Sequence, residues 1–219
     1  MRSRSRCDAN SGRAQSQHSE ANGALMRVVP LAMWMGRQPA VQVAKAAKQD
    51  ALLSHPSVVC QDANAAYAVA MAHLLTHPGN VRGAIVVAAN SSDITSTLVK
   101  RWLLEDSTLT KNEIASSLNC TGMVGHVRHA FTLAFHFLRR RTSFGDALLE
   151  TLQKGGDTDT SVAIVGGLMG ALHSAQAIPH SMKNAVLQYD CSSKLGRLRP
   201  FAFSPGRFKE LMDVIYPHQ

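Results

Sequence analysis

Apolar side chains recur at helical spacing along most of this chain. Between Ser57 and Leu75 they repeat every three or four residues, which is typical of an amphipathic helix. The interval from His126 to Arg141 carries a second long stripe of this kind. Val81 to Ala89 is apolar and partly β-branched, yet its surroundings favour a helix over a strand. Shorter helices are predicted over 24–35, 40–53, 94–105, 109–118, 143–153, 181–189 and 207–215.

These segments predict an all-α fold, a compact orthogonal multi-helix single domain. Residues 1–20 are polar, with hardly an apolar side chain, and are predicted to form a disordered tail. Residues 21–189 are predicted to hold the helical domain. Residues 190–219 are predicted to be a basic extension, punctuated by Pro and Gly, that carries a short helix.

Composition agrees with one sizeable core. The chain has 219 residues, of which 45% are apolar and 17% charged, as in globular proteins. Only 5% are aromatic, which favours helices over sheets. The formal net charge of +8 fits an anionic small-molecule or nucleotide ligand. Nucleic acid is the weaker interpretation, because the arginines do not interleave with aromatic side chains.

Two clusters of chemically active side chains have a structural interpretation that we favour. Arg139 to Arg141 end a predicted helix, where cations complement the helix dipole; a nucleic-acid patch is the alternative. His73 and His77 have a spacing that places both imidazoles on one helical face, as in some zinc sites. No Glu follows His73, however, so solvated histidines at a helix end are the better interpretation.

The cysteines and the N-terminus predict an intracellular, cytoplasmic protein that is not secreted. The four cysteines lie far apart without a Cys-x-x-Cys pair, which disfavours zinc ribbons and predicts reduced thiols. No apolar stretch approaches the length of a membrane span, so no membrane contact is expected. The basic, Ser-rich start lacks the apolar region of a secretory signal.

The most specific chemical pattern is the hexapeptide Gly155–Thr160, Gly-Gly-Asp-Thr-Asp-Thr, which runs into an apolar stretch rich in small residues. Two glycines permit a sharp turn, and Asp and Thr at a helix start can cap free N–H groups. A second interpretation is a site for a hard cation, because Mg²⁺ and Mn²⁺ prefer oxygen ligands. Asp157 and Asp159 together exceed what one cap requires, which favours the metal site.

Four segments in order resemble the ADP-ribosylglycohydrolase family, which includes the dinitrogenase reductase-activating enzymes. They are Asn22-Gly23-Ala24-Leu25-Met26-Arg27, Leu53-Ser54-His55-Pro56, Thr121-Gly122-Met123-Val124-Gly125-His126 and the hexapeptide Gly155–Thr160. Met123 stands where the family usually has an aromatic residue. The resemblance covers about residues 20–182.

The resemblance implies the all-α fold of that family and metal-assisted cleavage of the glycosidic bond between ADP-ribose and a protein side chain or related acceptor. Two Mg²⁺ or Mn²⁺ ions would orient the ribose and a water molecule. ADP-ribose or an ADP-ribosylated protein would be the partner. Carried over by position, the metal ligands would be Asp157, Asp159 and Thr160, while Asn22, Gly23, Ala24, Gly122, Met123 and His126 would bind substrate.

The chain departs from the family at its N-terminal side. Family members carry Gly-Asp-Ala-x-Gly and Thr-Asp-Asp-Thr segments upstream of the Asn-Gly-Ala stretch, and neither is present. Before Asn22 the only acids are Asp8 and Glu20. Three side chains supply about half of an octahedral set, so we expect one weakly held ion and impaired hydrolysis. The alternative is a non-catalytic ADP-ribose-binding or structural, crystallin-like relative.

Overall fold

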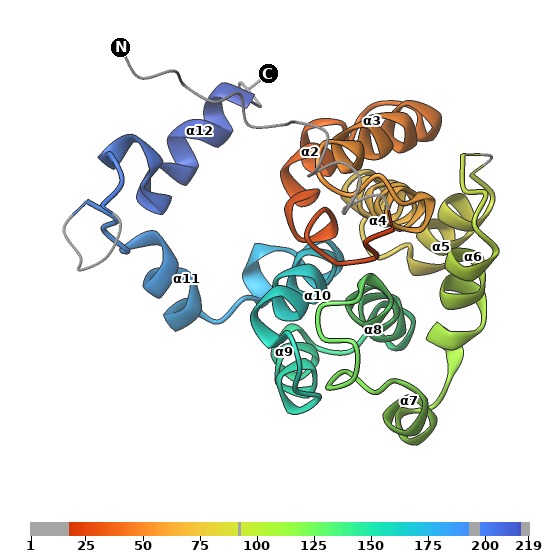
Figure 1. Cartoon of the computed structure of the whole chain (residues 1–219). Helices are drawn as coiled ribbons and strands as arrows, with labels where there is room; N and C mark the ends of the chain where they lie inside the picture. Colours follow the sequence, from red (N-terminus) through yellow and green to blue (C-terminus); the bar gives the residue numbers. More distant parts are fainter. Residues whose placement is uncertain (1–17, 92, 193–197, 216–219) are drawn as a thin grey trace, which may run out of the picture. The chain divides into compact units, whose positions relative to one another are not determined.

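The structure is a computed structural model that describes residues 18–91, 93–192 and 198–215. These residues are mainly helical (Figure 1). The chain divides into two compact units between Ser174 and Ala175. The first unit contains α2 (Val29–Trp34), α3 (Ala40–Leu52), α4 (Val58–Thr76), α5 (Val81–Ala89), α6 (Thr97–Leu104), α7 (Lys111–Ser117), α8 (Val127–Arg140), α9 (Phe144–Gln153) and α10 (Thr158–His173). The second contains α11 (His180–Leu187) and α12 (Phe208–Ile215).

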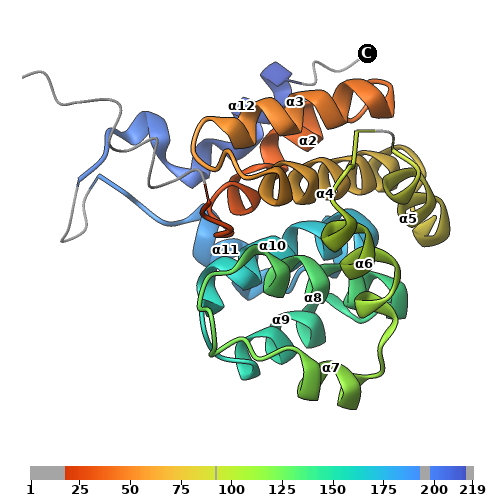
Figure 2. The same cartoon turned by 45° about the vertical axis from the view of Figure 1, so that its right-hand side comes forward.

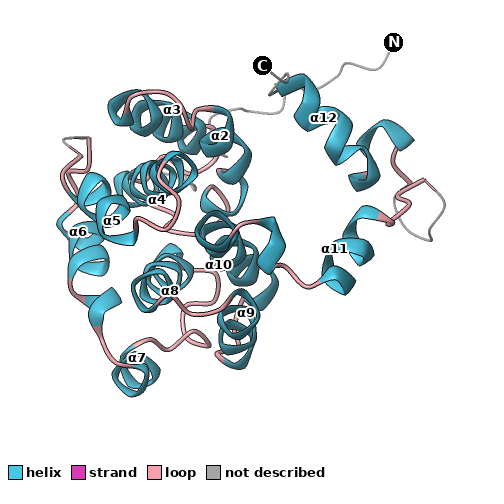
Figure 3. Cartoon of the chain, turned by 180° about the vertical axis from the view of Figure 1, so that it is seen from behind, coloured by secondary structure: helices cyan, strands magenta, loops and turns pink. Residues whose placement is uncertain are grey.

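The all-α prediction is confirmed. In the described ranges the β-type pairing consists of one isolated bridge, between Ala21 and His126, and the cartoon coloured by secondary structure shows helices and loops (Figure 3). Pro30 divides the predicted helix over 24–35. A 3₁₀ turn covers Leu25–Arg27, and α2 begins at Val29 with Pro30 in its first turn, where a missing N–H costs no intrahelical bond.

Helix α4 is the centre of the first unit, and the prediction that it is amphipathic is wrong. Side chains are buried all around it, and it packs on α2, α3, α5 and α10 (Figure 2). Its many alanines allow neighbours to approach from every direction, which is why no solvent face remains. A helix that is apolar all round is a core helix, so the three-to-four-residue spacing was only part of a broader apolar pattern.

One buried polar side chain of α4, Tyr67, finds its hydrogen-bond partner on α10. Tyr67 donates from its hydroxyl to the carbonyl of Ile164 over 2.6 Å. A Cβ atom at Gly167 would lie only 2.7 Å from that hydroxyl, so glycine is needed for α10 to approach α4 this closely. Burial and this packing explain why small residues follow the Gly155–Thr160 hexapeptide.

A buried ion pair joins α3 to α4. The Asp62 carboxylate is fully buried; its Oδ1 atom lies 2.7 Å from the Lys48 ammonium group. Its Oδ2 atom accepts from the backbone N–H groups of Thr95, over 2.8 Å, and Ser96, over 2.6 Å. These contacts hold the loop before α6 in place, and they give Asp62 a structural role.

Helix α8 lies beside α10 and α6 and is largely buried (Figure 1). Its N-cap is His126, whose Nδ1 atom accepts from the backbone N–H of Arg128 over 3.1 Å. Its C-cap is Arg141, which adopts the left-handed conformation with φ of 51°. The two ends of α8 are therefore defined by side chains of different chemistry.

The second unit consists of α11, α12 and short 3₁₀ turns over Ala175–Ala177, Phe201–Phe203 and Pro205–Arg207. It begins earlier in the chain than the extension predicted to start at residue 190. Of the predicted disordered tail over 1–20, residues 1–17 lie outside the described residues. None of the helices in the described part is long and apolar enough to cross a membrane.

Candidate functional site

The segment before the first helix pairs with the segment before α8. The backbone N–H of Asn22 donates to the carbonyl of Gly125 over 2.8 Å, and that of Val127 donates to the carbonyl of Glu20 over the same distance. Together with the bridge between Ala21 and His126, these bonds hold two stretches that are far apart in sequence. Two of the four motif segments are thereby placed side by side.

The hexapeptide joins them through one side-chain contact. The Asn22 amide donates from Nδ2 to the Asp157 Oδ2 atom over 2.8 Å, and Asn22 is buried. Gly125 lies against the same carboxylate, since a Cβ there would be 3.4 Å from Oδ2. Asn22, Gly125 and Asp157 thus form a junction of three motif segments.

The hexapeptide forms the predicted loop at a helix N-terminus. Gly155 and Gly156 have φ values of 69° and 73°, in the left-handed region that favours glycine, and α10 begins two residues later at Thr158. A Cβ on Gly156 would lie 2.0 Å from the carbonyl oxygen of Cys120. The loop therefore rests directly on the chain before the Thr121–His126 segment, and only glycine fits there.

Asp157 occupies the N-cap position of α10 and is half-buried, whereas Asp159 is exposed. Partial burial raises the pKa of Asp157, but interactions with the Asn22 amide, the Thr160 hydroxyl and the Asp159 carboxyl group outweigh it and lower that pKa below its ordinary value. Asp157 is therefore ionised at neutral pH. The Asp159 carboxyl group and the Thr160 hydroxyl are both close enough to interact with the Asp157 carboxylate.

His126 is held from both ring nitrogens. Because Nδ1 accepts from the backbone of α8, the neutral ring carries its proton on Nε2, which lies 3.0 Å from the Glu20 Oε2 atom. The indole ring of Trp102 meets the imidazole edge-on, with 6.0 Å between ring centroids. The ring is thus oriented by Glu20 on one side and by the start of α8 on the other.

The other predicted substrate residues lie around this junction in different ways. Gly23 is half-buried and lies against the His55 ring, whose pKa is lowered by burial and by the nearby Arg27 charge. Ala24 is fully buried, so it supports the loop from behind. Gly122 is half-buried, and Met123 is 72% exposed with a left-handed φ of 50°.

Comparison with known proteins identifies the family of the chain. The sequence pattern of the ADP-ribosylglycohydrolase family matches residues 1–206, most of the chain. The chain belongs to the ADP-ribosylglycohydrolase family. It is also similar, with 26% identity over 187 residues, to a protein of Acanthamoeba polyphaga mimivirus whose name describes it, provisionally, as an ADP-ribosyl glycohydrolase. That alignment covers 80% of this chain and 56% of the relative, so the chain spans little more than half of the relative's length.

The hexapeptide at the junction offers the kinds of oxygen ligand that a hard cation prefers, but only a few of them. Asp157, Asp159 and Thr160 offer two carboxylates and a hydroxyl, which are the oxygen ligands that Mg²⁺ and Mn²⁺ prefer. Among the described residues no group of three or more His, Cys, Asp or Glu side chains could hold a metal ion. The side chains therefore fit such an ion in kind and supply about half of an octahedral set.

Glu20 is the member of this site that sequence reasoning missed. It stands in polar sequence without periodicity, and only the bridge between Ala21 and His126 brings its carboxylate to the imidazole. The buried acid Asp62 has a different role. Asp62 is paired with Lys48 in the core, so it is not available to bind an ion at the junction.

Proposed function

We propose that this chain carries the ADP-ribose-binding part of an ADP-ribosylglycohydrolase, which cleaves the glycosidic bond between ADP-ribose and a protein side chain or related acceptor. The observation that carries the proposal is the 2.8 Å hydrogen bond from Asn22 to Asp157. It joins the Asn-Gly segment, the Gly125–His126 segment and the acidic hexapeptide at one place. Family membership supports the reaction class.

Each side chain at the junction has a role that follows from its contacts. Asn22 and Gly23 would present the turn against which the phosphates of ADP-ribose bind, since a turn before a helix exposes N–H donors. His126 and Met123 would line the adenosine side. Asp157, Asp159 and Thr160 would hold Mg²⁺ or Mn²⁺, and a bound ion of this kind polarises oxygen and lowers the pKa of water.

A non-catalytic ADP-ribose-binding relative is the second candidate. The observation that favours it is the small number of ligands: two carboxylates and one hydroxyl in the described residues, with no larger acidic group. An ion held by so few ligands supplies less transition-state stabilisation, and catalysis then falls by orders of magnitude. Binding through Asn22 and Gly23 would persist.

The test is release of ADP-ribose from an ADP-ribosylated protein in the presence of Mg²⁺ or Mn²⁺, beside calorimetry with free ADP-ribose. We expect slow but metal-dependent release, and Asp157→Asn should lower it by about 10²-fold or more, since it removes an interaction made in the transition state. Asp146→Asn is the matched control, because this exposed acid caps α9 with Ser143.

The two candidates give different results. Binding of ADP-ribose without metal-dependent release would favour the non-catalytic relative. Neither binding nor release would contradict both. In a parallel thermal measurement, Mg²⁺ should raise the melting temperature, because a ligand of the folded state stabilises it by mass action. The double change of Asp157→Asn with Asp159→Asn should abolish that shift.

A further inference from the structure

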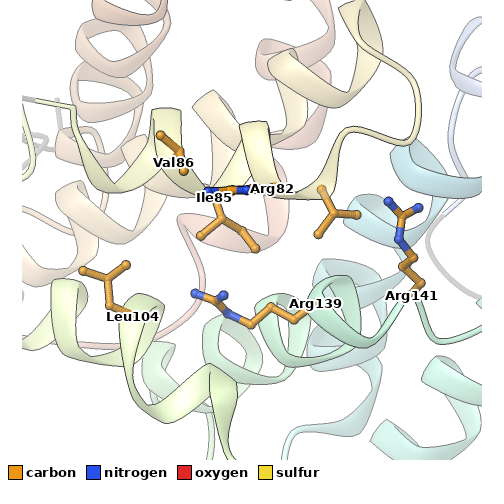
Figure 4. A pocket seen from close by; sticks show the side chains of 7 residues that line it. Arg82, Ile85, Val86, Leu104, Arg139 and Arg141 are labelled. Atoms are coloured by element: carbon orange, nitrogen blue, oxygen red, sulfur yellow. The ribbon is translucent and has the colours of Figure 1, made fainter.

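A cavity lies between α5, the end of α6 and the end of α8. It has a volume of about 560 Å³, and Figure 4 shows its lining side chains. This is within the roughly 300–1,000 Å³ range of small-molecule sites. The lining residues are Val81, Arg82, Ile85, Val86, Leu104, Arg139 and Arg141, which we call the arginine groove.

The arginine groove is separate from the junction of Asn22, Gly125 and Asp157. His126 caps the N-terminus of α8, whereas Arg139 and Arg141 lie at its C-terminal end. A rise of 1.5 Å per residue puts these ends about 20 Å apart. The groove therefore belongs to no motif segment, and the proposed hydrolysis makes no use of it.

Two of the three guanidinium groups are held in place by neutral acceptors. Arg139 donates from Nε to the Ser107 hydroxyl and from Nη2 to the Leu103 carbonyl, both over 2.8 Å. Arg141 donates from Nη2 to the Gly79 carbonyl over 2.8 Å. These bonds use three N–H groups and leave the rest of each planar fork for a ligand.

Among the described residues, no carboxylate forms an ion pair with any of these three guanidinium groups. In the described ranges the ion pairs of the neighbouring acid, Asp106, go to Arg101 and Arg128, and none reaches Arg82, Arg139 or Arg141. Partial burial lowers the pKa of Arg139, yet a guanidinium stays charged at neutral pH. Uncompensated, pre-oriented guanidinium groups favour a dianion that accepts bidentate bonds, and a phosphomonoester is such a group.

The remaining wall is aliphatic. Val81 and Ile85 are buried, while Val86 and Leu104 are 46% and 47% exposed beside the charges. Figure 4 shows Ile85 and Val86 on the α5 side, with Arg139 reaching toward Leu104. None of the seven lining residues is aromatic, so the groove offers no platform on which a base could stack. An aliphatic body fits better than a nucleobase.

From this juxtaposition we propose that the arginine groove binds an aliphatic phosphomonoester, with the phosphate on Arg82, Arg139 and Arg141 and the aliphatic part on Val86 and Leu104. Such a group occurs in soluble alkyl phosphates and in the headgroup of phosphatidate. Both parts of the ligand contribute, so hexyl phosphate binds more tightly than inorganic phosphate, and neutral hexanol binds least.

The experiment is calorimetric titration of the full chain with hexyl phosphate, inorganic phosphate and hexanol. Arg82 makes no hydrogen bond to the described part of the chain, and Arg82→Ala should weaken hexyl phosphate about tenfold or more, as for loss of a charge-assisted bond. Arg141→Gly should weaken hexyl phosphate to the same extent. Glycine is the replacement here because it accepts the left-handed φ of this position. Arg140→Ala is the control: it removes the same charge one residue away and does not line the groove.

The aliphatic wall is tested separately by Leu104→Ser, which should weaken hexyl phosphate and leave inorganic phosphate unchanged. Sedimentation with vesicles containing phosphatidate shows whether the headgroup is also a source. Soluble binding that Arg82→Ala and Arg141→Gly remove and Arg140→Ala retains supports the proposal. Equal losses in all three variants, no binding of hexyl phosphate, or binding to vesicles alone would overturn it.

Discussion

The two ends of α8 are built in opposite ways. At its N-terminal end, His126, Glu20, Asn22 and Asp157 come together from segments far apart in sequence. At its C-terminal end, Arg139 and Arg141 come from one basic run and bond to backbone and hydroxyl oxygens. Both arrangements agree with the helix dipole, which favours anions at the first end and cations at the second. The first end gathers its side chains from several distant segments, whereas at the second end a local basic run bonds to acceptors from distant segments.

The largest effect is expected at the loop that supports the junction. Gly156→Ala places a methyl group against the Cys120 carbonyl at a left-handed φ, so unfolding in urea should show a loss of about 2–4 kcal/mol. Gly170→Ala, later in α10, meets no atom within 4 Å and should instead stabilise by about 0.5–1 kcal/mol. Equal effects of the two changes would show that the loop does not need its close approach.

At the opposite end of α8 the expected loss of unfolding free energy is smaller. Arg139→Ala removes two hydrogen bonds, to the Ser107 hydroxyl and the Leu103 carbonyl, and should cost about 1–2 kcal/mol in the same measurement. The exposed Arg140 makes no such contact with the residues that the structure describes, so Arg140→Ala should stay within about 0.5 kcal/mol of the parent. If Arg140→Ala cost as much, the groove would have no specific role for Arg139.

The contact between the Glu20 carboxylate and the His126 imidazole should contribute less again. Glu20→Gln keeps a possible acceptor for the His126 proton but removes the charge, and about 0.5–1 kcal/mol should be lost. Because the Glu20 side chain is partly exposed, added salt should reduce the difference between the two proteins. A stability difference that does not change with salt concentration would indicate that Glu20 acts through packing.

The smallest effect is a pH dependence that is expected for Asp157 at the junction and not for Arg139 in the groove. The folded pKa of Asp157 lies below its unfolded value of about 3.9, so its stabilisation is present above that pH and is lost as pH falls through the folded pKa. The melting temperatures of the parent and Asp157→Asn should therefore converge in acid. Arg139→Ala should keep a constant difference over this range, since arginine does not titrate.

Much of the fold follows from the sequence, because helix formation depends on local pattern and on local breakers. Helices α3, α5, α8, α9 and α11 begin and end within a few residues of their predicted bounds, next to Pro, Gly or capping side chains. The pattern predicted the bounds of α4 but not its burial on all sides. Its many alanines give no sign in the sequence of a solvent-facing side. In the structure neither side of the helix faces solvent.

The candidate site divides in the same way. The Gly155–Thr160 loop was predictable because two adjacent glycines and a helix start impose it. Glu20 was not, because a lone acid in polar sequence gives no periodic or spacing signal, and its partner His126 is found only through the backbone bridge. The arginine groove was missed for the same reason, since Leu104 and Arg82 lie in different helices from Arg139.

The sequence by itself determined the helices, the family and the identity of the acidic loop, because each rests on residues that are neighbours along the chain. Only the tertiary structure decided which of those residues meet. The bond from Asn22 to Asp157 and the cavity between α5 and α8 exist because buried packing around α4 brings distant segments into contact. Such contacts arise from the shape and volume of the whole core, which no local pattern records.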